Sequence, residues 1–193
     1  MLDHLLQLII LFVVIFDPFA SLVIFLVATE KTTHDERRKI ANTALIVAAA
    51  VSALFLLFGT AVLSLFNTSI KEFQVAGGIV LGILGVKMVL GYSLARVEEL
   101  KNSTGWAIAS IIGTPLLTGP AAITAIIVSV NDYGRTVTGT ALFLVFILTA
   151  LLFYNAGRID KVLGRTSIKV ISTILGLITL SWGVKYVLSG LGV

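Results

Sequence analysis

The sequence contains no cysteine, only three prolines and few charged residues. The absence of cysteine excludes disulfides, thiol catalysis and iron–sulfur ligation. Charged residues make up 12% of the 193 residues, whereas a typical soluble domain has about 25%. Hydrophobic residues account for 58%, and the mean hydropathy is +1.06. Such a composition predicts a protein that lies in a lipid bilayer.

Six apolar stretches are each long enough to cross a hydrocarbon core of about 30 Å, which takes about 20 residues. They run approximately over residues 5–29, 41–66, 69–93, 105–131, 135–157 and 165–191. The segments between them are short loops, which leave no room for a soluble domain. We therefore expect an all-α membrane protein made of one transmembrane domain, residues 1–193, without a nucleic-acid partner. The N-terminus lacks the basic region of a cleavable signal peptide, so the first stretch is expected to remain as a span.

The basic residues predict which loops face the cytoplasm, because cytoplasmic loops carry an excess of Lys and Arg. Ten of the 14 fall in the first, third and fifth loops: Lys31, Arg37, Arg38, Lys39, Arg96, Lys101, Arg158, Lys161, Arg165 and Lys169. The second and fourth loops hold only Lys71 and Arg135. This bias predicts six full crossings with both termini outside. A rival layout makes the first and fourth stretches re-entrant hairpins. It is disfavoured because it places seven basic residues on the cytoplasmic side and five outside, so that the bias nearly disappears.

The two halves of the chain have similar sequences. Residues 68–90 and 166–188 match at 10 of 23 positions and share TSIK and GVK at one spacing. Two further pairs of segments align, namely residues 43–54 with 140–151 and residues 17–24 with 119–126. Each half, residues 1–97 and 98–193, then holds three spans. Because three is odd, the second half is inverted relative to the first, an arrangement typical of secondary transporters with a substrate site near the membrane midplane.

The first span is interrupted at its centre by Asp17 and Pro18. Proline cannot donate a helical hydrogen bond, and its ring clashes with the preceding turn. Asp17 fits an N-cap and Pro18 the first residue of a new helix, which predicts half-helices over residues 5–16 and 18–29. A charged carboxylate at this depth is costly unless it faces protein or water. Asp17 therefore either only caps the second half-helix or also binds an ammonium group, a proton or a sodium ion.

The fourth span has similar interruptions at Thr114–Pro115 and Gly119–Pro120, so all three prolines fall in these two spans. In an inverted repeat, the second half-helices of both spans would begin near the midplane. Their N-termini carry a partial positive charge and unpaired N–H groups, which suit a carboxylate or another small anion. The alternative is that the prolines only kink the helices. Two matched interruptions, one with an acid, favour a substrate pathway.

Other polar residues in the spans have structural explanations. Lys87 and Lys185 are repeat mates near span ends, where their side chains are expected to reach the interface. Gly78 and Gly82 form a surface of small residues that favours close helix packing. Four further side chains either line a cavity or join helices: Gln74, Thr149, Asn155 and Ser172.

The motifs FDPFASLVIFL, DERRKIA, AGGIVLGILG and PLLTGPAAIT resemble the MarC family of bacterial and archaeal membrane proteins over essentially the whole chain. This resemblance implies a six-span integral protein of the plasma membrane, the cell inner membrane. Some members are identified as transporters of small neutral amino acids, and an archaeal branch is associated with glycine uptake. The residues that match the family's two interruption motifs are Asp17, Pro18, Phe19, Pro115, Gly119 and Pro120. Ala20 and Ala121 stand where many members have glycine, so the size of the substrate is expected to differ.

Together these features favour a secondary transporter of small neutral amino acids such as glycine or alanine, coupled to a proton or sodium gradient. An uncoupled channel or exporter is the alternative. An enzyme is disfavoured because Asp17 has no His, Cys or second carboxylate to act with it. We expect no metal and no cofactor beyond the coupling ion, and as partners a zwitterionic amino acid and membrane lipid. The predicted substrate-binding residues are Asp17, Pro18, Phe19, Ser21, Thr114, Thr118, Gly119, Pro120 and Thr124.

Overall fold

The computed structural model describes residues 2–91 and 103–193, and the regular structure of these residues is entirely helical. The helices are α1 (Leu2–Phe16), α2 (Pro18–Ala28), α3 (His34–Leu65), α4 (Ile70–Val89), α6 (Gly105–Ile111), the π-helical η1 (Ile112–Leu117), α7 (Pro120–Tyr154) and α8 (Ala156–Leu191). The predicted all-α class is thus confirmed. Arg96 and Lys101, which enter the topology prediction, lie outside the described residues, as does the boundary between residues 97 and 98.

Five helical segments are long and apolar enough to cross a membrane: Asp3–Ala28, His34–Leu65, Ile70–Val89, Pro120–Tyr154 and Thr166–Leu191. The sequence predicts six spans. The difference arises because α7 continues for 35 residues through a kink at Gly134, where φ is 82°. The apolar segment Gly105–Thr114, before η1, is shorter than the other five.

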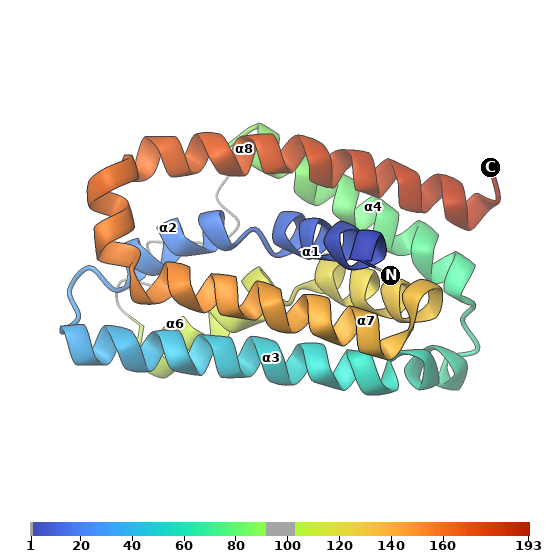
Figure 1. Cartoon of the computed structure of the whole chain (residues 1–193), viewed down its shortest axis with the longest axis horizontal. Helices are drawn as coiled ribbons and strands as arrows, with labels where there is room; N and C mark the ends of the chain where they lie inside the picture. Colours follow the sequence, from blue (N-terminus) through green and yellow to red (C-terminus); the bar gives the residue numbers. More distant parts are fainter. Residues whose placement is uncertain (1, 92–102) are drawn as a thin grey trace.

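The helices run lengthwise through an elongated molecule (Figure 1). The pair α1 and α2 lies end to end and crosses the molecule once, and α3 runs back along the bottom of this view, where it contacts α6 and α7. After α4 and α6, α7 doubles back on itself at its kink, which lies at the same end as the loop between α3 and α4. The labelled N- and C-termini both lie in the right half of this view.

The N-terminal ends of α3 and α4 are fixed by the same local motif. Thr33 accepts a hydrogen bond from the backbone N–H of Glu36 at 3.3 Å, and the Glu36 carboxylate accepts one from the Thr33 N–H at 2.8 Å. Ser69 and Glu72 repeat this exchange at 3.2 and 2.7 Å. Such a capping box satisfies backbone donors that a helix start otherwise leaves unpaired. It sets where each of these two long helices begins.

The most extensive helix contact among the described residues is between α4 and α8, which contain the matching segments of the two halves. Their backbones meet at glycines. A Cβ atom on Gly183 would lie 2.6 Å from the backbone nitrogen of Gly82 and 2.8 Å from the carbonyl oxygen of Gly78. A Cβ on Gly85 would lie 2.6 Å from the nitrogen of Leu180. Only glycine allows this approach, and we call the contact the glycine seam.

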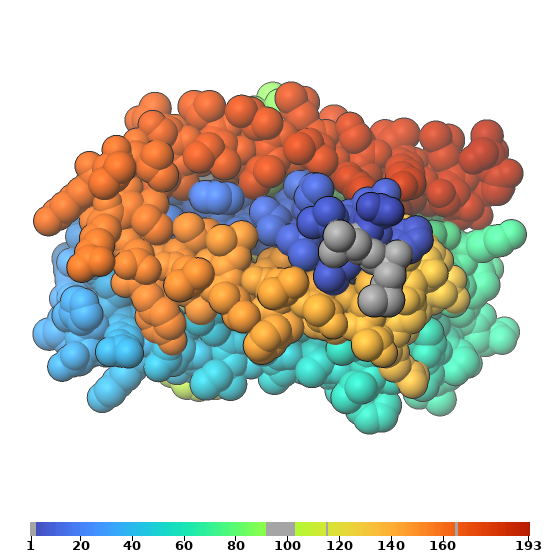
Figure 2. Space-filling model, viewed as in Figure 1, coloured from blue at the N-terminus to red at the C-terminus, as the bar shows by residue number. Residues whose placement is uncertain are grey.

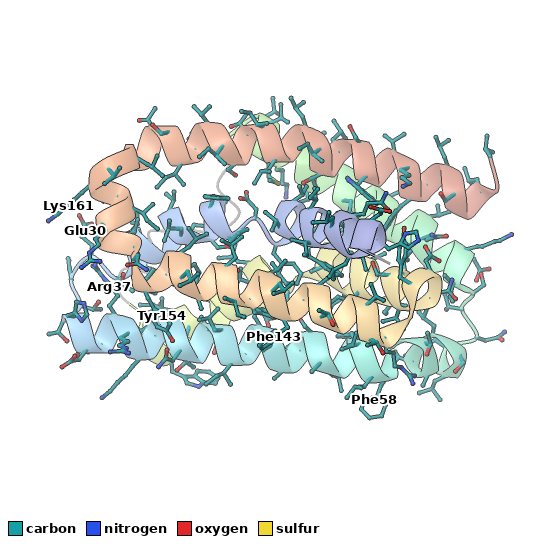
Figure 3. All side chains as sticks on the ribbon, viewed as in Figure 1. Glu30, Arg37, Phe58, Phe143, Tyr154 and Lys161 are labelled. Atoms are coloured by element: carbon teal, nitrogen blue, oxygen red, sulfur yellow. The ribbon has the colours of Figure 1, made fainter. Side chains whose placement is uncertain are left out.

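The interior of the molecule is apolar and so is much of its surface. Figure 2 shows the surface of α1, in dark blue, set between α7 and α8. Phe12 and Phe25 are fully buried, and Phe25 stacks on Phe153 with ring centroids 4.7 Å apart. Large apolar side chains also point outward, among them Phe58 and Phe143, which are labelled in Figure 3. Exposed apolar faces along the whole length of the helices are what a lipid environment favours.

Candidate functional site

The first interruption is a single residue between two helices. Asp17 adopts left-handed backbone angles, φ 37° and ψ 68°, and caps α2, in which Pro18 is the first residue. Asp and Asn tolerate this conformation better than most side chains, and proline suits a first helical position because it needs no N–H partner there. The local sequence therefore ends α1 at Phe16 and starts α2 at Pro18 without leaving the Asp17 N–H unpaired, since it donates to Val13 at 3.2 Å.

The carboxylate of Asp17 is buried, with 2% of the residue exposed. Its Oδ1 atom accepts a hydrogen bond from the Ala20 N–H at 3.1 Å. Its Oδ2 atom accepts one from the hydroxyl of Ser172, which comes from α8. Two donors, one local and one 155 positions away in sequence, thus hold the carboxylate in place. No Lys or Arg side chain of the described residues pairs with it.

The second interruption is longer. Thr114 leaves helical geometry inside η1, with φ −147° and ψ 118°, which is the extended conformation expected of a residue before proline. The Thr118 N–H still donates to the Gly113 carbonyl at 3.1 Å. Gly119 then caps α7 with an extended backbone, and Pro120 occupies its first turn. Unlike α2, α7 has no side chain bonded to its N-terminal N–H groups.

Both interruptions line one cavity of about 170 Å³. Its walls come from the end of α1, from α4, from η1 and from the start of α7: Ile15, Phe16, Asp17, Val80, Leu84, Met88, Leu116, Leu117, Gly119, Pro120, Ala121 and Ala122. Val80, Leu84 and Met88 are spaced by four residues and so share one face of α4. Among these described lining residues, Asp17 has the only polar side chain. The cavity is therefore an apolar chamber with a single acid.

The two interruptions bring groups of opposite electrostatic character to this cavity. Asp17 is the one acid among its lining residues. α7 begins at the cavity wall, and its uncapped N-terminus carries the positive end of the helix dipole and unpaired N–H groups. An apolar chamber lined by both an acid and a helix N-terminus suits a small molecule that carries both an ammonium and a carboxylate group.

The nine predicted substrate-binding residues occupy different places. Asp17, Gly119 and Pro120 line the cavity. Pro18 and Ser21 are buried in α2, and Phe19 is half-buried. The three predicted threonines are not among the cavity-lining residues. Thr118 donates to the Ala48 carbonyl at 3.2 Å, Thr124 donates to the Pro120 carbonyl at 3.0 Å, and Thr114 is exposed.

The structure adds two features that the predicted set of site residues does not include. Ser172 joins α8 to Asp17, although the sequence only marks it as a polar residue that either lines a cavity or joins helices. The apolar wall formed by Val80, Leu84 and Met88 carries no signal in the sequence, because every face of a membrane helix is apolar. In residues 2–91 and 103–193, no group of three or more His, Asp or Glu side chains is arranged to hold a metal ion.

The family model and the similar proteins found by comparison point to the same family. The model of the MarC family of integral membrane proteins matches residues 2–193. The chain is 30% identical over 185 residues to a UPF0056 membrane protein of Methanocaldococcus jannaschii, covering 92% of this chain and 90% of the relative. It is 32% identical over 175 residues to the UPF0056 membrane protein YvbG of Bacillus subtilis, covering 84% and 82% of the two chains.

A third relative is a UPF0056 membrane protein of Archaeoglobus fulgidus, which is 31% identical over 190 residues, with 92% of this chain and 87% of the relative covered. No solved structure matches the chain. The family match extends over nearly every residue and confirms the resemblance carried by the sequence motifs. The protein belongs to the MarC family of integral membrane proteins.

Proposed function

We propose that this protein is a secondary transporter of small neutral amino acids such as glycine or alanine, coupled to a proton or sodium gradient across the plasma membrane. The observation that carries the proposal is the cavity that both interruptions line, to which Asp17 contributes an acid and α7 an uncapped N-terminus. A zwitterion places opposite charges at its two ends, so one molecule can satisfy both. The carboxylate would lie at the helix N-terminus and the ammonium group at Asp17.

The size of the cavity supports a small substrate. An engineered protein cavity of about 150 Å³ holds benzene, a ligand of about six heavy atoms. Alanine has the same number of heavy atoms and glycine one fewer, so either suits a chamber of about 170 Å³. Val80, Leu84 and Met88 form an apolar wall of bulky side chains on one side of this chamber. We infer that this wall limits the substrate to the smallest amino acids.

We further propose six crossings arranged as a three-plus-three inverted repeat, with the interruptions near the membrane midplane. The 26 residues of Asp3–Ala28 would extend about 39 Å at 1.5 Å per residue, enough to cross a hydrocarbon core with Asp17 inside it. The doubling back of α7 at Gly134 supports dividing this helix between two crossings. The residues before Gly134 would complete one crossing, and the residues after it would form the next. The contact between the matching segments of α4 and α8 supports a symmetry axis between the halves.

Binding of the substrate is tested with a thermal-shift titration of the purified protein. Glycine and alanine are expected to raise the melting temperature, because a ligand that binds only the folded state stabilises it by mass action. Leucine serves as the oversized control, and ethanolamine and acetate each carry only one of the two charged groups. The proposal would be contradicted if no amino acid raised the melting temperature, or if leucine raised it as much as alanine.

Gradient coupling is tested in proteoliposomes with radiolabelled glycine. When a proton or sodium gradient is imposed, glycine is expected to accumulate inside the vesicles above its external concentration. This uptake is expected to stop when both gradients are collapsed. An uncoupled channel, the alternative function, would equilibrate glycine at the same rate with or without the gradients. The two experiments separate binding from coupling, because a channel with a glycine site would pass the first and fail the second.

The orientation of the chain provides a separate prediction. With six crossings and basic loops inside, both termini face outside, so single cysteines at Asp3 and Ser189 are expected to react with a membrane-impermeant maleimide in intact cells. The natural sequence has no cysteine, so the unmodified protein gives no background. A cysteine at Lys161 is the matched control and is expected to react only after the membrane is opened. Labelling of just one terminus would require an odd number of crossings.

A further inference from the structure

We propose that a groove between the start of α3 and the end of α7 binds the phosphate group of an anionic membrane lipid. This groove, called here the inner groove, has a volume of about 270 Å³ and is lined by His34, Arg37, Arg38, Ala41, Phe153 and Tyr154. Two lining side chains are arginines, a third is a histidine, and none is acidic. Arg37 and Tyr154 lie toward one end of the molecule in Figure 3, the same end as the labelled Glu30 and Lys161.

Arg38 lies over an aromatic ring. Its guanidinium carbon lies 5.7 Å from the centroid of the Tyr154 ring. The Tyr154 hydroxyl in turn donates a hydrogen bond to the side chain of Asn42, which fixes the ring against α3. A planar guanidinium stacked on an aromatic ring keeps its N–H donors free at its edge, and these match the spacing of phosphate oxygens.

Arg37 is only partly satisfied. One terminal nitrogen donates to the Thr29 carbonyl at 2.8 Å. Its Nε atom is buried and has no hydrogen-bond partner within the described residues. Neither Arg37 nor Arg38 forms an ion pair in this part of the chain. The two guanidinium groups of the groove therefore carry positive charge that no carboxylate of the described residues balances, which favours an anion from outside the chain.

The surroundings of the inner groove favour a lipid as the source of that anion. One helical turn from Asn42 and Tyr154, toward the middle of α3 and α7, are Ile46 and Leu151, which are 67% and 56% exposed. Phe143, further along the same direction of α7, is 65% exposed. A phosphate in the groove would leave two acyl chains over this apolar face. Basic pockets between membrane helices on the cytoplasmic side are known to hold anionic headgroups in this way.

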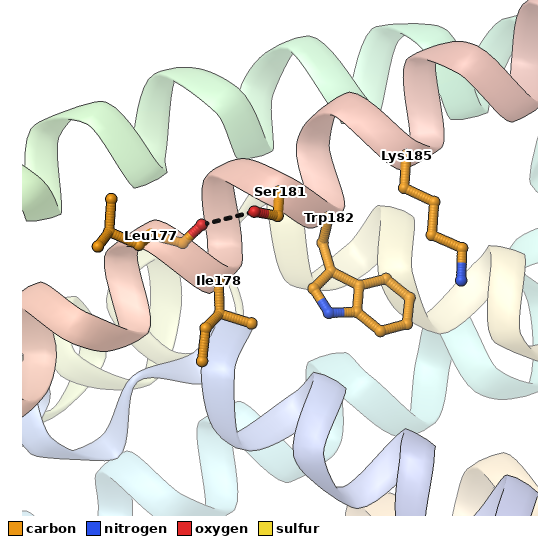
Figure 4. Close-up of a pocket in the computed structure, with 5 residues that line it drawn as sticks. All are labelled: Leu177, Ile178, Ser181, Trp182 and Lys185. Carbon is orange, nitrogen blue, oxygen red and sulfur yellow. Dashed lines mark hydrogen bonds between the residues drawn. The ribbon is translucent and has the colours of Figure 1, made fainter.

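A second surface hollow, on α8, lacks these features. It is lined by Leu177, Ile178, Ser181, Trp182 and Lys185 (Figure 4). Its single cation, the Lys185 ammonium, already lies 4.5 Å from the centroid of the Trp182 ring, and the Ser181 hydroxyl donates to the Leu177 carbonyl at 3.1 Å. Its polar groups are thus engaged within the protein. The inner groove combines two arginines with an unpaired buried donor.

The proposal is tested by titrating delipidated protein in a non-ionic detergent with phosphatidylglycerol, phosphatidylcholine or inorganic phosphate, and following the melting temperature and lipid adducts by native mass spectrometry. Phosphatidylglycerol is expected to stabilise and to remain bound, whereas phosphatidylcholine is not. Arg38→Gln is expected to weaken the apparent affinity for phosphatidylglycerol by about tenfold, as the loss of a charge-assisted contact predicts. Arg38→Lys keeps the charge without the planar fork and is expected to recover only part of this affinity.

Lys39→Gln is the matched control. It removes the same charge from the next residue of α3, which lines a different groove against α6. If Lys39→Gln and Arg38→Gln weaken the affinity for phosphatidylglycerol equally, the lipid is held by diffuse electrostatic attraction and not at a specific site, and the proposal is overturned. Stabilisation by inorganic phosphate at the same concentration as the lipid would also overturn it, since the site would then hold a soluble anion. The melting temperature of each variant without lipid shows that it is folded, and Arg37→Gln provides a second test of the same groove.

Discussion

Asp17→Asn is expected to weaken amino-acid binding about 30-fold and to reduce gradient-driven uptake strongly, while leaving the protein folded. Asparagine caps helices as well as aspartate does, so its oxygen can accept from the Ala20 N–H and α2 keeps its start. Its NH2 group then faces Ser172, whose hydroxyl oxygen can accept the hydrogen bond in place of donating one. What the substitution removes is the charge in the cavity. An ammonium group bound at Asp17 would lose a charge-assisted hydrogen bond worth about 2 kcal/mol, which weakens affinity about 30-fold.

The measurements are the thermal-shift response to glycine and radiolabelled uptake, both on protein of matched expression. The melting temperature of unliganded Asp17→Asn is expected to equal or exceed that of the natural protein, because removal of a buried charge relieves a desolvation cost. Asp132→Asn makes the same chemical change at an exposed residue and is expected to leave uptake intact. Normal uptake by Asp17→Asn would mean that Asp17 only caps α2.

Gly183→Ala is expected to destabilise the protein strongly, although it adds a single methyl group. That methyl carbon would lie 2.6 Å from the backbone nitrogen of Gly82, so α4 and α8 would have to separate. Overpacking of this kind costs about 2–3 kcal/mol, which corresponds to a fall in melting temperature of about 5–10 °C in a chain of this length. Helices in a membrane are held together by close packing, so the loss is not recovered by hydrophobic burial elsewhere.

Gly82→Ala provides the matched control in the same pair of helices. A Cβ atom on Gly82 would have its nearest neighbour, Leu180 Cδ1, at 3.9 Å, an ordinary contact distance. Alanine also favours a helix over glycine by about 1 kcal/mol, so this variant is expected to melt at the same temperature or higher. Differential scanning fluorimetry of the two purified variants makes the comparison. Equal stability of both would show that α4 and α8 do not meet as closely as the glycine seam requires.

Local sequence chemistry was sufficient to predict the start of α2. An acid followed by proline fits a helical segment well as a cap and a first residue, and the structure has Asp17 and Pro18 in those roles. The predicted half-helices, residues 5–16 and 18–29, differ from α1 and α2 by one to three residues at their outer ends. The internal similarity of the halves is also visible in the sequence, and its most similar segments lie in α4 and α8, which pack together.

The composition of the cavity walls could not be predicted in the same way. The hydrogen bond between Ser172 and Asp17 depends on how α8 is rotated about its axis, which an evenly apolar sequence does not encode. For the same reason nothing distinguishes Leu84, which lines the cavity, from Ile83, which is 54% exposed. The hydroxyl of Thr118 instead donates to the Ala48 carbonyl of α3, because a buried hydroxyl needs an acceptor within the protein. Short-range signals locate the interruptions, whereas helix rotation decides which side chains reach the cavity.

The glycine seam also determines how this chain can change over evolutionary time. A larger residue at Gly183 would meet backbone atoms of Gly82 and Gly78, and no second substitution can make a backbone smaller. The position therefore has no compensating partner and must stay glycine while the seam lasts. The cavity wall is different, because it is built of side chains such as those of Leu84 and Leu116. A larger residue at one wall position can be offset by a smaller residue at another. The shape of the cavity is thus open to change by mutation of its wall, whereas the contact that joins α4 and α8 is not.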